Sequence, residues 1–321
     1  RQGARITGAT VDTPQGPRQV QARSGVVLAC GGFPHDADRQ AAWFGHPGHR
    51  SAAWPGNTGD GLRLAEAAGA ALDRLDADPA AWAPVSAVGA AVFPHLVERG
   101  KPGLIAVDAR GERFVDEAGD YHRFMRALLA RHPPGRPVAA WLVVDHRFQR
   151  RWGLGHSKPW PLPLAPWLQS GYLQKGDTLD ELARRCGIDP AGLARTVAAY
   201  NHHAARGEDP AFGRGSTAYG RMQGDPEHDG PNPCVAPIGP GPFYAVRIQP
   251  GSLGTFAGVA ADAWGRALDA QGRPVDGLYV AGNDRASVMR GHYPSGGITL
   301  GPAMTFGYLA AHHAAGRPPN D

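Results

Sequence analysis

The sequence predicts an α/β fold in which one sheet is interrupted by a large inserted domain. Two short apolar runs, 25–29 and 277–281, end in glycine turns, which is typical of buried parallel strands. Between these runs, residues 82–250 are rich in Trp, Pro and His and mix strands with helices. The first and last parts of the chain therefore build one sheet, and the middle part is an α+β insertion. The predicted domains cover residues 1–85, 86–250 and 251–321.

The composition excludes several classes of function. The net charge is +4, and the basic residues are scattered, without the stripe that nucleic-acid binding requires. Cys30, Cys186 and Cys234 show neither a disulfide framework nor a zinc spacing, so we expect no metal and a reducing, cytoplasmic location. No apolar run reaches the roughly 18 residues of a membrane helix. We therefore expect neither a nucleic-acid partner nor a membrane span.

The first segment predicts a hairpin, a strand and a helix. Runs 6–13 and 18–22 read as short strands on either side of a Pro-Gln-Gly-Pro turn, which indicates a β-hairpin. Run 25–29 predicts a buried strand that ends in the glycine turn 30–32. Residues 62–72 have helical apolar spacing, and the Thr and Asp residues just before them are good signals for a helix start.

The insertion and the return segment predict further helices and one more strand. In the insertion, the expected helices cover 116–131, 179–186 and 190–205. After residue 255 the chain reads as a hairpin that leads into a second buried strand, 277–281. A final helix is expected over 301–315, because Gly301 and Pro302 stand at its start, where proline is tolerated.

Three glycine turns predict a nucleotide site. A glycine after a buried strand lets a phosphate or a ring approach the backbone, and nucleotides bind beyond the strand ends of open α/β sheets. We therefore expect these turns to lie side by side, although each taken singly could be a plain turn. The candidate cofactor-binding residues in them are Ala29, Gly31, Gly32, Asn57, Thr58, Gly59, Asp60, Gly282 and Asn283.

A fourth segment, 291–304, adds a glycine pair at the start of the final helix. Such a pair presents free N–H groups and the positive end of the helix dipole to a ligand. A glycine-rich turn before a helix, without a ligand, is the alternative. The further cofactor-binding candidates are Gly297, Ile298 and Thr299.

The motifs together resemble a known family. VVLACGGF, GNTGDGLRLAEAAGA, VDARGERFVDE and YVAGND…YPSGGITLGPAMTFGYLAA resemble the FAD-binding family of the fumarate reductase flavoproteins and the 3-ketosteroid dehydrogenases. The resemblance covers nearly the whole chain and is thin between about 135 and 175. It implies FAD as the cofactor, a Rossmann-like FAD-binding sheet and an inserted substrate-binding domain. It also implies hydride transfer to or from the flavin.

The substrate side distinguishes the branches of the family. The succinate and fumarate enzymes carry an arginine just before the final helix, and here that position is Pro294. Arg285 and Arg290 lie nearby at the wrong offset, and a bidentate carboxylate partner cannot be displaced by several residues without losing its geometry. The sequence therefore disfavours dicarboxylate chemistry.

The resemblance to the steroid enzymes assigns catalytic candidates. Tyr293 stands four residues before Gly297, and in those enzymes the corresponding hydroxyl and amide hold a 3-keto oxygen. Tyr121 lies where the family has a tyrosine base, by position alone, so simple packing is an equal alternative. Ser295 resembles the enzymes that desaturate the 4,5-bond, which leaves the regiochemistry open. The apolar insertion, with Trp82, Trp141, Trp152, Trp160 and Trp167, suits a hydrophobic pocket.

One family motif is missing from the sequence. No GxGxxG stands in a strand-turn-helix context, so we expect the N-terminal half of the FAD-binding domain to be absent. The implied partners are an apolar small-molecule substrate, an external electron acceptor and that missing half. Two alternatives stay open: a relative of fumarate reductase that acts on a small unsaturated carboxylate, and an inactive truncated fragment.

Overall fold

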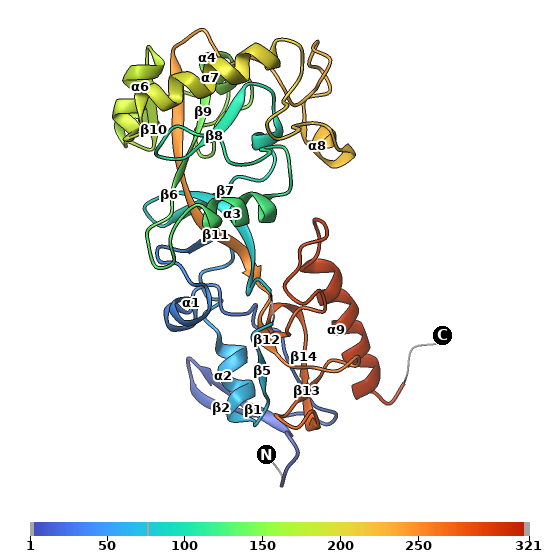
Figure 1. Cartoon of the computed structure of the whole chain (residues 1–321). Coiled ribbons are helices and arrows are strands. Elements are labelled where there is room, and N and C mark those ends of the chain that lie inside the picture. The colour runs from blue at the N-terminus through green and yellow to red at the C-terminus, as the bar shows by residue number, and fades with distance from the viewer. Residues whose placement is uncertain (1–2, 76, 318–321) are drawn as a thin grey trace. The chain divides into compact units, whose positions relative to one another are not determined.

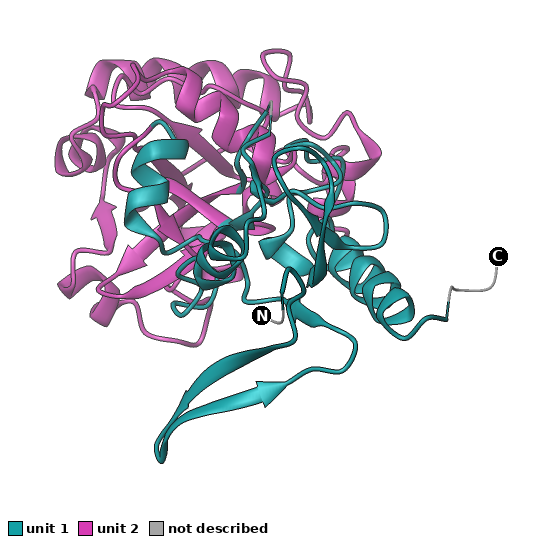
Figure 2. Ribbon diagram, turned by 90° about the horizontal axis from the view of Figure 1, so that it is seen from below, with its two compact units in different colours: residues 1–45, 53–81, 253–321 teal, residues 46–52, 82–252 magenta. Residues whose placement is uncertain are grey.

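The computed structural model describes residues 3–75 and 77–317 (Figure 1). The chain forms two compact units (Figure 2). Unit 1 consists of residues 1–45, 53–81 and 253–321, and unit 2 consists of residues 46–52 and 82–252. The short segment 46–52 thus belongs to unit 2, whereas the predicted first domain contained it. The assignment of the cofactor to one unit and the substrate to the other remains a prediction.

Unit 1 is built on a three-stranded sheet with the order β13 (Arg266–Leu268), β14 (Pro274–Val280) and β3 (Val26–Leu28). β14 and β3 are parallel, with Leu278 opposite Val26 and Val280 opposite Leu28, so the two predicted strands are neighbours. β3 is less buried than expected, because it is the last strand of the described sheet. Leu28 is buried, but Val27 is 45% exposed.

Short elements complete unit 1. Its helices are α1 (Ala37–Trp43), α2 (Asp60–Ala67), α9 (Leu300–Ala314) and the 3-10 turn η2 (Gly282–Asp284). α2 is shorter than the predicted helix 62–72, because the chain turns at Gly69, whose φ is +86°. β5 (Leu72–Asp73) then pairs with β12 (Gly258–Val259).

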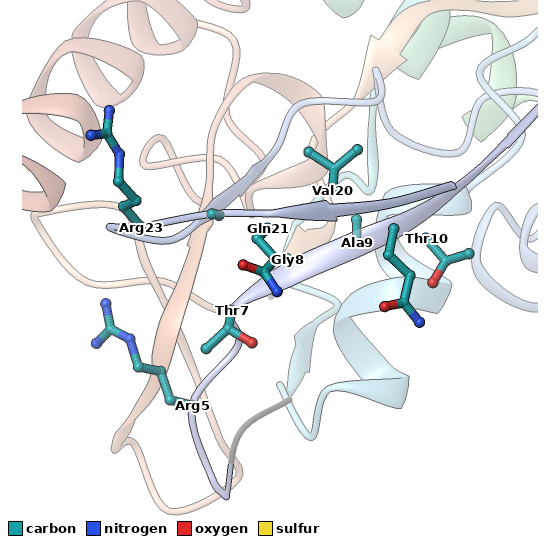
Figure 3. Close-up of a pocket in the computed structure, with 10 residues that line it drawn as sticks. Arg5, Thr7, Gly8, Ala9, Thr10, Val20, Gln21 and Arg23 are labelled. Atoms are coloured by element: carbon teal, nitrogen blue, oxygen red, sulfur yellow. The ribbon is translucent and has the colours of Figure 1, made fainter. Parts of the chain in front are cut away.

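The predicted hairpin is present as β1 (Gly8–Thr13) and β2 (Gly16–Gln21). Both of its faces are largely exposed, and Val11 and Val20 are about half exposed. A polar cavity of about 610 Å³ lies over the hairpin, between Arg5, Arg23 and the strand side chains (Figure 3). None of the predicted site residues lines this cavity.

Unit 2 is built on a seven-stranded sheet, although residues 80–81 and 253–255 of its strands are counted in unit 1. β11 (Phe243–Thr255) is its long central strand, and the order is β7-β6-β11-β9-β8, with β10 and β4 also paired to β11. The other strands are β4 (Arg50–Ser51), β6 (Ala80–Val88), β7 (Ala91–Pro94), β8 (Leu104–Val107), β9 (Ala140–Asp145) and β10 (Leu173–Gly176). The helical elements are η1 (Glu98–Gly100), α3 (Tyr121–Ala130), α4 (His146–Arg151), α5 (Ala165–Gln169), α6 (Leu179–Cys186), α7 (Pro190–Ala204) and α8 (Ala218–Gln223).

Local capping explains where these helices begin and end. Gly187, with φ +69°, ends α6, and the Asp189 side chain caps α7 by accepting the N–H of Gly192, so both predicted helices are confirmed. The predicted helix 116–131 begins only at Tyr121. Its first residues form a turn, in which Gly119 donates to the carbonyl of Asp116, and Asp120 caps the helix.

The buried core of unit 2 lies between the sheet and the helices α6 and α7. Its members are buried aliphatic and aromatic side chains, among them Ile105, Val143, Leu182, Leu193, Val197, Tyr200 and Ala245. No helix among the described residues is both long and apolar enough to cross a membrane.

Candidate functional site

The three glycine turns lie side by side in unit 1. The buried carboxylate of Asp284 accepts the backbone N–H groups of Cys30 and Gly32, the latter at 2.9 Å. Gly59 in turn donates its N–H to the carbonyl of Gly32 at 3.1 Å. The strand ends at 29–32, the segment 57–61 and the turn 281–284 therefore form one cluster, as the sequence predicts for their arrangement.

Two of the predicted glycines are needed for this packing. Gly31 and Gly32 have φ values of +91° and +77°. A Cβ atom at Gly31 would lie 2.6 Å from the Asn57 side chain, and one at Gly32 would collide with the Thr255 hydroxyl. At these two positions the glycine lets one part of the chain approach another, which the sequence alone did not distinguish from an approach to a ligand.

The other predicted residues of the cluster differ in exposure. Asn57 and Thr58 are half-buried, Gly59 is buried and Asp60, which pairs with Arg63, is exposed. Gly282 and Asn283 are half-buried, and Ala29 is exposed. A Cβ at Gly282 would have no atom within 4 Å, so this glycine faces open space.

Asp284 is a residue of this cluster that the sequence analysis did not single out. Burial raises the pKa of its carboxyl, although the two backbone N–H groups that it accepts favour the charged form. Burial and the Asp284 charge also raise the pKa of the Cys30 thiol, whose side chain is exposed. The signal for Asp284 was its place in the run Gly-Asn-Asp, directly after a buried strand.

The backbone at the start of α9 is open. Gly297 has φ +87°, and neither a Cβ at Gly297 nor one at Gly296 would have an atom within 4 Å. Thr299 is the N-cap, but its side chain makes no capping hydrogen bond. Ile298 is 7% exposed and packs with Ala81 and Phe256, so the helix start is anchored while its glycine pair remains open.

Tyr293 packs against the same cluster. Its ring centroid lies 6.2 Å from that of Phe256, and the residue is half-buried, whereas Pro294 and Ser295 are exposed. The two nearby arginines are engaged elsewhere. Arg290 pairs with Asp73, and the Arg285 guanidinium lies 3.6 Å from the centre of the Phe306 ring.

Tyr121 belongs to unit 2 and is the first residue of α3. Burial, followed by the neighbouring Tyr219 and Asp120, raises the pKa of its phenol to about 12, while the charge of Arg99 lowers it. A tyrosine base at neutral pH therefore needs a nearby positive charge.

The five tryptophans of the insertion are dispersed rather than gathered. Trp82 is buried in β6 beside His49, whereas Trp160 is 72% exposed under Arg150. Trp141 packs on the core of unit 2, and Trp167 stacks on His156. Trp152 packs against Phe148 at the end of α4. That the insertion provides a hydrophobic substrate pocket stays a prediction.

These features fit the ring end of a flavin. Open glycine backbone at 282 and 296–297, together with an uncapped helix start, offers N–H donors where a ring that gains negative charge on reduction could lie. The sequence holds no GxGxxG for the pyrophosphate. Within residues 3–75 and 77–317, no cluster of three or more metal-ligating side chains is present.

Comparison with known proteins decides the family. The model of the FAD-binding domain family matches residues 1–300. The chain belongs to this family. FAD is the cofactor that membership indicates.

Three relatives show where the chain stands in this family. A 4-oxocyclohex-2-ene-1-carboxylate 5-dehydrogenase from Sinomonas cyclohexanicum is 42% identical over 97% of this chain and 54% of its own length. A 3-oxosteroid 1-dehydrogenase from Mycobacterium tuberculosis is 42% identical over 93% of this chain and 54% of its own. The crystal structure of a 3-ketosteroid Δ1-dehydrogenase from Sterolibacterium denitrificans superimposes with a TM-score of 0.87 and 40% identity, over 97% of this chain and 57% of that one. The chain thus spans about half the length of the relatives it matches.

Proposed function

We propose that this chain is the larger part of an FAD-dependent dehydrogenase that acts on a CH–CH bond beside a ring ketone. The observation that carries the proposal is the Tyr293–Gly297 pair at the open start of α9. The half-buried Tyr293 has a packed ring, and the Gly297 backbone faces open space. Relatives with 40–42% identity carry the names of 3-oxosteroid and oxocyclohexene carboxylate dehydrogenases.

Each residue then has a chemical task. The Tyr293 hydroxyl and the Gly297 N–H donate to the ketone oxygen and stabilise the negative charge that develops there. This charge acidifies the neighbouring carbon, and the phenolate of Tyr121 takes the proton from it. Bound FAD supplies the acceptor for the hydride that leaves the next carbon. Ser295 lies two residues from Tyr293 and leaves open which bond of the ring is oxidised.

Two substrate classes share this ring ketone. A 3-oxosteroid is the first candidate, because it matches the Tyr-Pro-x-x-Gly arrangement. A small oxocyclohexane carboxylate is the second, because a relative named for such a substrate is 42% identical. Fumarate and succinate are disfavoured, since Pro294 occupies the arginine position and the fumarate reductases are more distant relatives.

We also propose that cofactor binding needs further polypeptide of the FAD-binding domain. Leu300, Met304 and Tyr308 are 65%, 67% and 53% exposed and stand at intervals of four residues on α9. Such a spacing places them on one face of the helix, and an exposed apolar stripe of this kind marks a contact surface. A glycine-rich segment packed there would supply the pyrophosphate site, and an external acceptor would reoxidise the enzyme.

Steady-state kinetics test the proposal. The chain is joined to the glycine-rich half of a 3-oxosteroid dehydrogenase and assayed with a 3-oxosteroid, 4-oxocyclohexanecarboxylate and an artificial electron acceptor. Tyr293→Phe removes one donor from the developing charge, so we expect turnover to fall roughly a hundredfold, equivalent to about 3 kcal/mol, with flavin content unchanged. Tyr121→Phe should lower turnover by at least the same factor.

Two outcomes would contradict this assignment. Near-normal turnover of Tyr293→Phe would remove the ketone-binding role, because a packing tyrosine tolerates loss of its hydroxyl. Succinate oxidation at about 10 per second would restore the dicarboxylate alternative.

A further inference from the structure

Arg99 is one of the largest fully buried side chains of unit 2, with an exposed fraction of 1%. It lies in η1, and the hydrogen bonds of its guanidinium go to backbone carbonyls. Nε donates to His95 at 2.6 Å, and Nη2 donates to Leu96 at 3.2 Å. The remaining bonds reach a distant segment, the turn that precedes α3.

That turn is held at two points. Arg99 Nη1 donates to the carbonyl of Glu117 at 2.8 Å, and Nη2 donates to the carbonyl of Gly119 at 3.3 Å. The guanidinium carbon also lies 4.8 Å from the centre of the Phe124 ring, in the first turn of α3. Tyr121 stands between Gly119 and Phe124, so a single arginine contacts the chain on both sides of this tyrosine.

Arg99 and Arg214 donate mainly to backbone carbonyls, whereas Arg113 pairs directly with two carboxylates. Arg113 binds the carboxylates of Glu117 and Asp209 at 2.6–2.8 Å, and Arg214 lies 3.4 Å from Glu117. The bonds of Arg99 to carbonyls leave its charge less fully neutralised, and a buried cation of this kind is costly. Buried charges of this kind occur at functional sites and in structural ion-pair networks.

Several titratable groups face this cation. They are Glu98, which is hydrogen-bonded to His95, and Tyr219, Asp120, Glu117 and Tyr121. Tyr219 comes from α8, which packs close to the same turn. A Cβ at Gly220 would lie 3.7 Å from the Cβ of Ala118. Tyr121 and Tyr219 therefore share Arg99 and Asp120 as charged neighbours.

We propose that Arg99 is a positioning residue for Tyr121. Its guanidinium fixes the backbone on both sides of this tyrosine and places a buried positive charge near the phenol, which favours the phenolate that accepts the substrate proton. The inference rests on the proposed role of Tyr121 as the base. Without Arg99, burial, Tyr219 and Asp120 would all oppose ionisation of the phenol.

The test measures ionisation of Tyr121 directly, in this chain and without substrate. The tyrosines are replaced by 3-fluorotyrosine, whose phenol ionises at lower pH, and the signal of Tyr121 is assigned by its loss in Tyr121→Phe. Fluorine-19 NMR then follows the ionisation of each variant. We expect Arg99→Met to move it to higher pH by about one unit or more, since an opposite charge nearby is worth about that much. In Arg99→Lys, which keeps the positive charge, Tyr121 should ionise at nearly the same pH as in the wild type.

A matched control and a second variant complete the test. Arg126 is exposed on the same helix, so Arg126→Met should leave the ionisation of Tyr121 nearly unchanged. If Arg99→Met does not fold, citrulline at position 99 retains most of the N–H donors without the charge and should give the same upward shift. An unchanged ionisation in the variant that folds would overturn the proposal. Full turnover of Tyr121→Phe would instead overturn the role of the base, while the titration would still report on Arg99.

Discussion

The interior of each unit is stabilised by a different kind of contact. In unit 1, backbone meets backbone at three glycine turns, with the single carboxylate of Asp284 between them. In unit 2, three buried arginines and two buried carboxylates join the strands to the turn before α3. Backbone next to the glycine turns, at Gly282 and Gly297, has no neighbouring atom where a side chain would lie. The ion pairs of unit 2 are instead buried among other side chains. The comparison teaches that the cluster in unit 1 depends on glycines without a side chain, whereas the network in unit 2 depends on buried charged side chains.

The largest expected effect lies in unit 2. Arg113→Met leaves Glu117 and Asp209 buried without their main partner, so we expect the free energy of unfolding to fall by about 3–5 kcal/mol. Urea unfolding followed by circular dichroism measures it. Arg110→Met is the control, because that arginine is largely exposed and its ion pairs are worth little. Equal losses for both variants would show that burial of the pair is unimportant.

A smaller effect separates the closed glycines of unit 1 from the open ones. Gly32→Ala combines an unfavourable positive φ with a collision against Thr255, so it should destabilise the chain by about 3 kcal/mol. Gly297→Ala meets no atom and should cost only the conformational strain, about 1–2 kcal/mol. Thermal unfolding of both variants checks the order, and a greater loss for Gly297→Ala would contradict the distinction.

The smallest effect is a contrast in pH dependence between two buried aspartates. Burial raises the pKa of Asp284, so its contribution to stability is present below its ordinary value of 3.8 and is lost as the pH rises through the higher folded value. Although burial alone would raise it, the hydrogen bonds and charge of Arg113 lower the pKa of Asp209. Its contribution is present above 3.8 and is lost as the pH falls through the lower folded value.

Asparagine variants separate these two contributions. The stability difference between wild type and Asp284→Asn should move against the wild type as the pH rises from acid toward neutral. The difference for Asp209→Asn should move in favour of the wild type over the same change. Urea unfolding at several pH values measures both. The same direction for the two variants would refute the contrast.

The helices of unit 2 show what the sequence could predict. α6 and α7 match their predicted ranges closely, because their caps, Thr178, Gly187 and Asp189, are local signals. The predicted start of α3, at residue 116, was five residues too early, since the helix begins at Tyr121. The Asp116 turn and the Asp120 cap use residues that also suit a helix, and the contacts that select the turn come from Arg99, 18 and 20 residues away.

In the candidate site, too, local features were predicted and long-range contacts were not. The glycine turns were found because a strand that ends in glycine is a local pattern, and their adjacency follows from the parallel pairing of β3 and β14. Asp284 and the buried arginines were missed, because most of their hydrogen-bond partners lie 96 or more residues away in the sequence. No pattern in one sequence reveals which charged residue a fold will enclose.

The exposed thiol of Cys30 lies in the glycine cluster and can be labelled chemically. Cys186 and Cys234 are buried, so an alkylating reagent applied to the folded chain should react at this one position. Because burial and the Asp284 charge raise its pKa, the reaction needs mildly alkaline solution. Cys30 adjoins the turns that we expect to contact the flavin. The rate at which the reagent modifies Cys30 should therefore fall when this surface is covered. It can be read without colour, substrate or turnover, and it reports when that surface becomes covered.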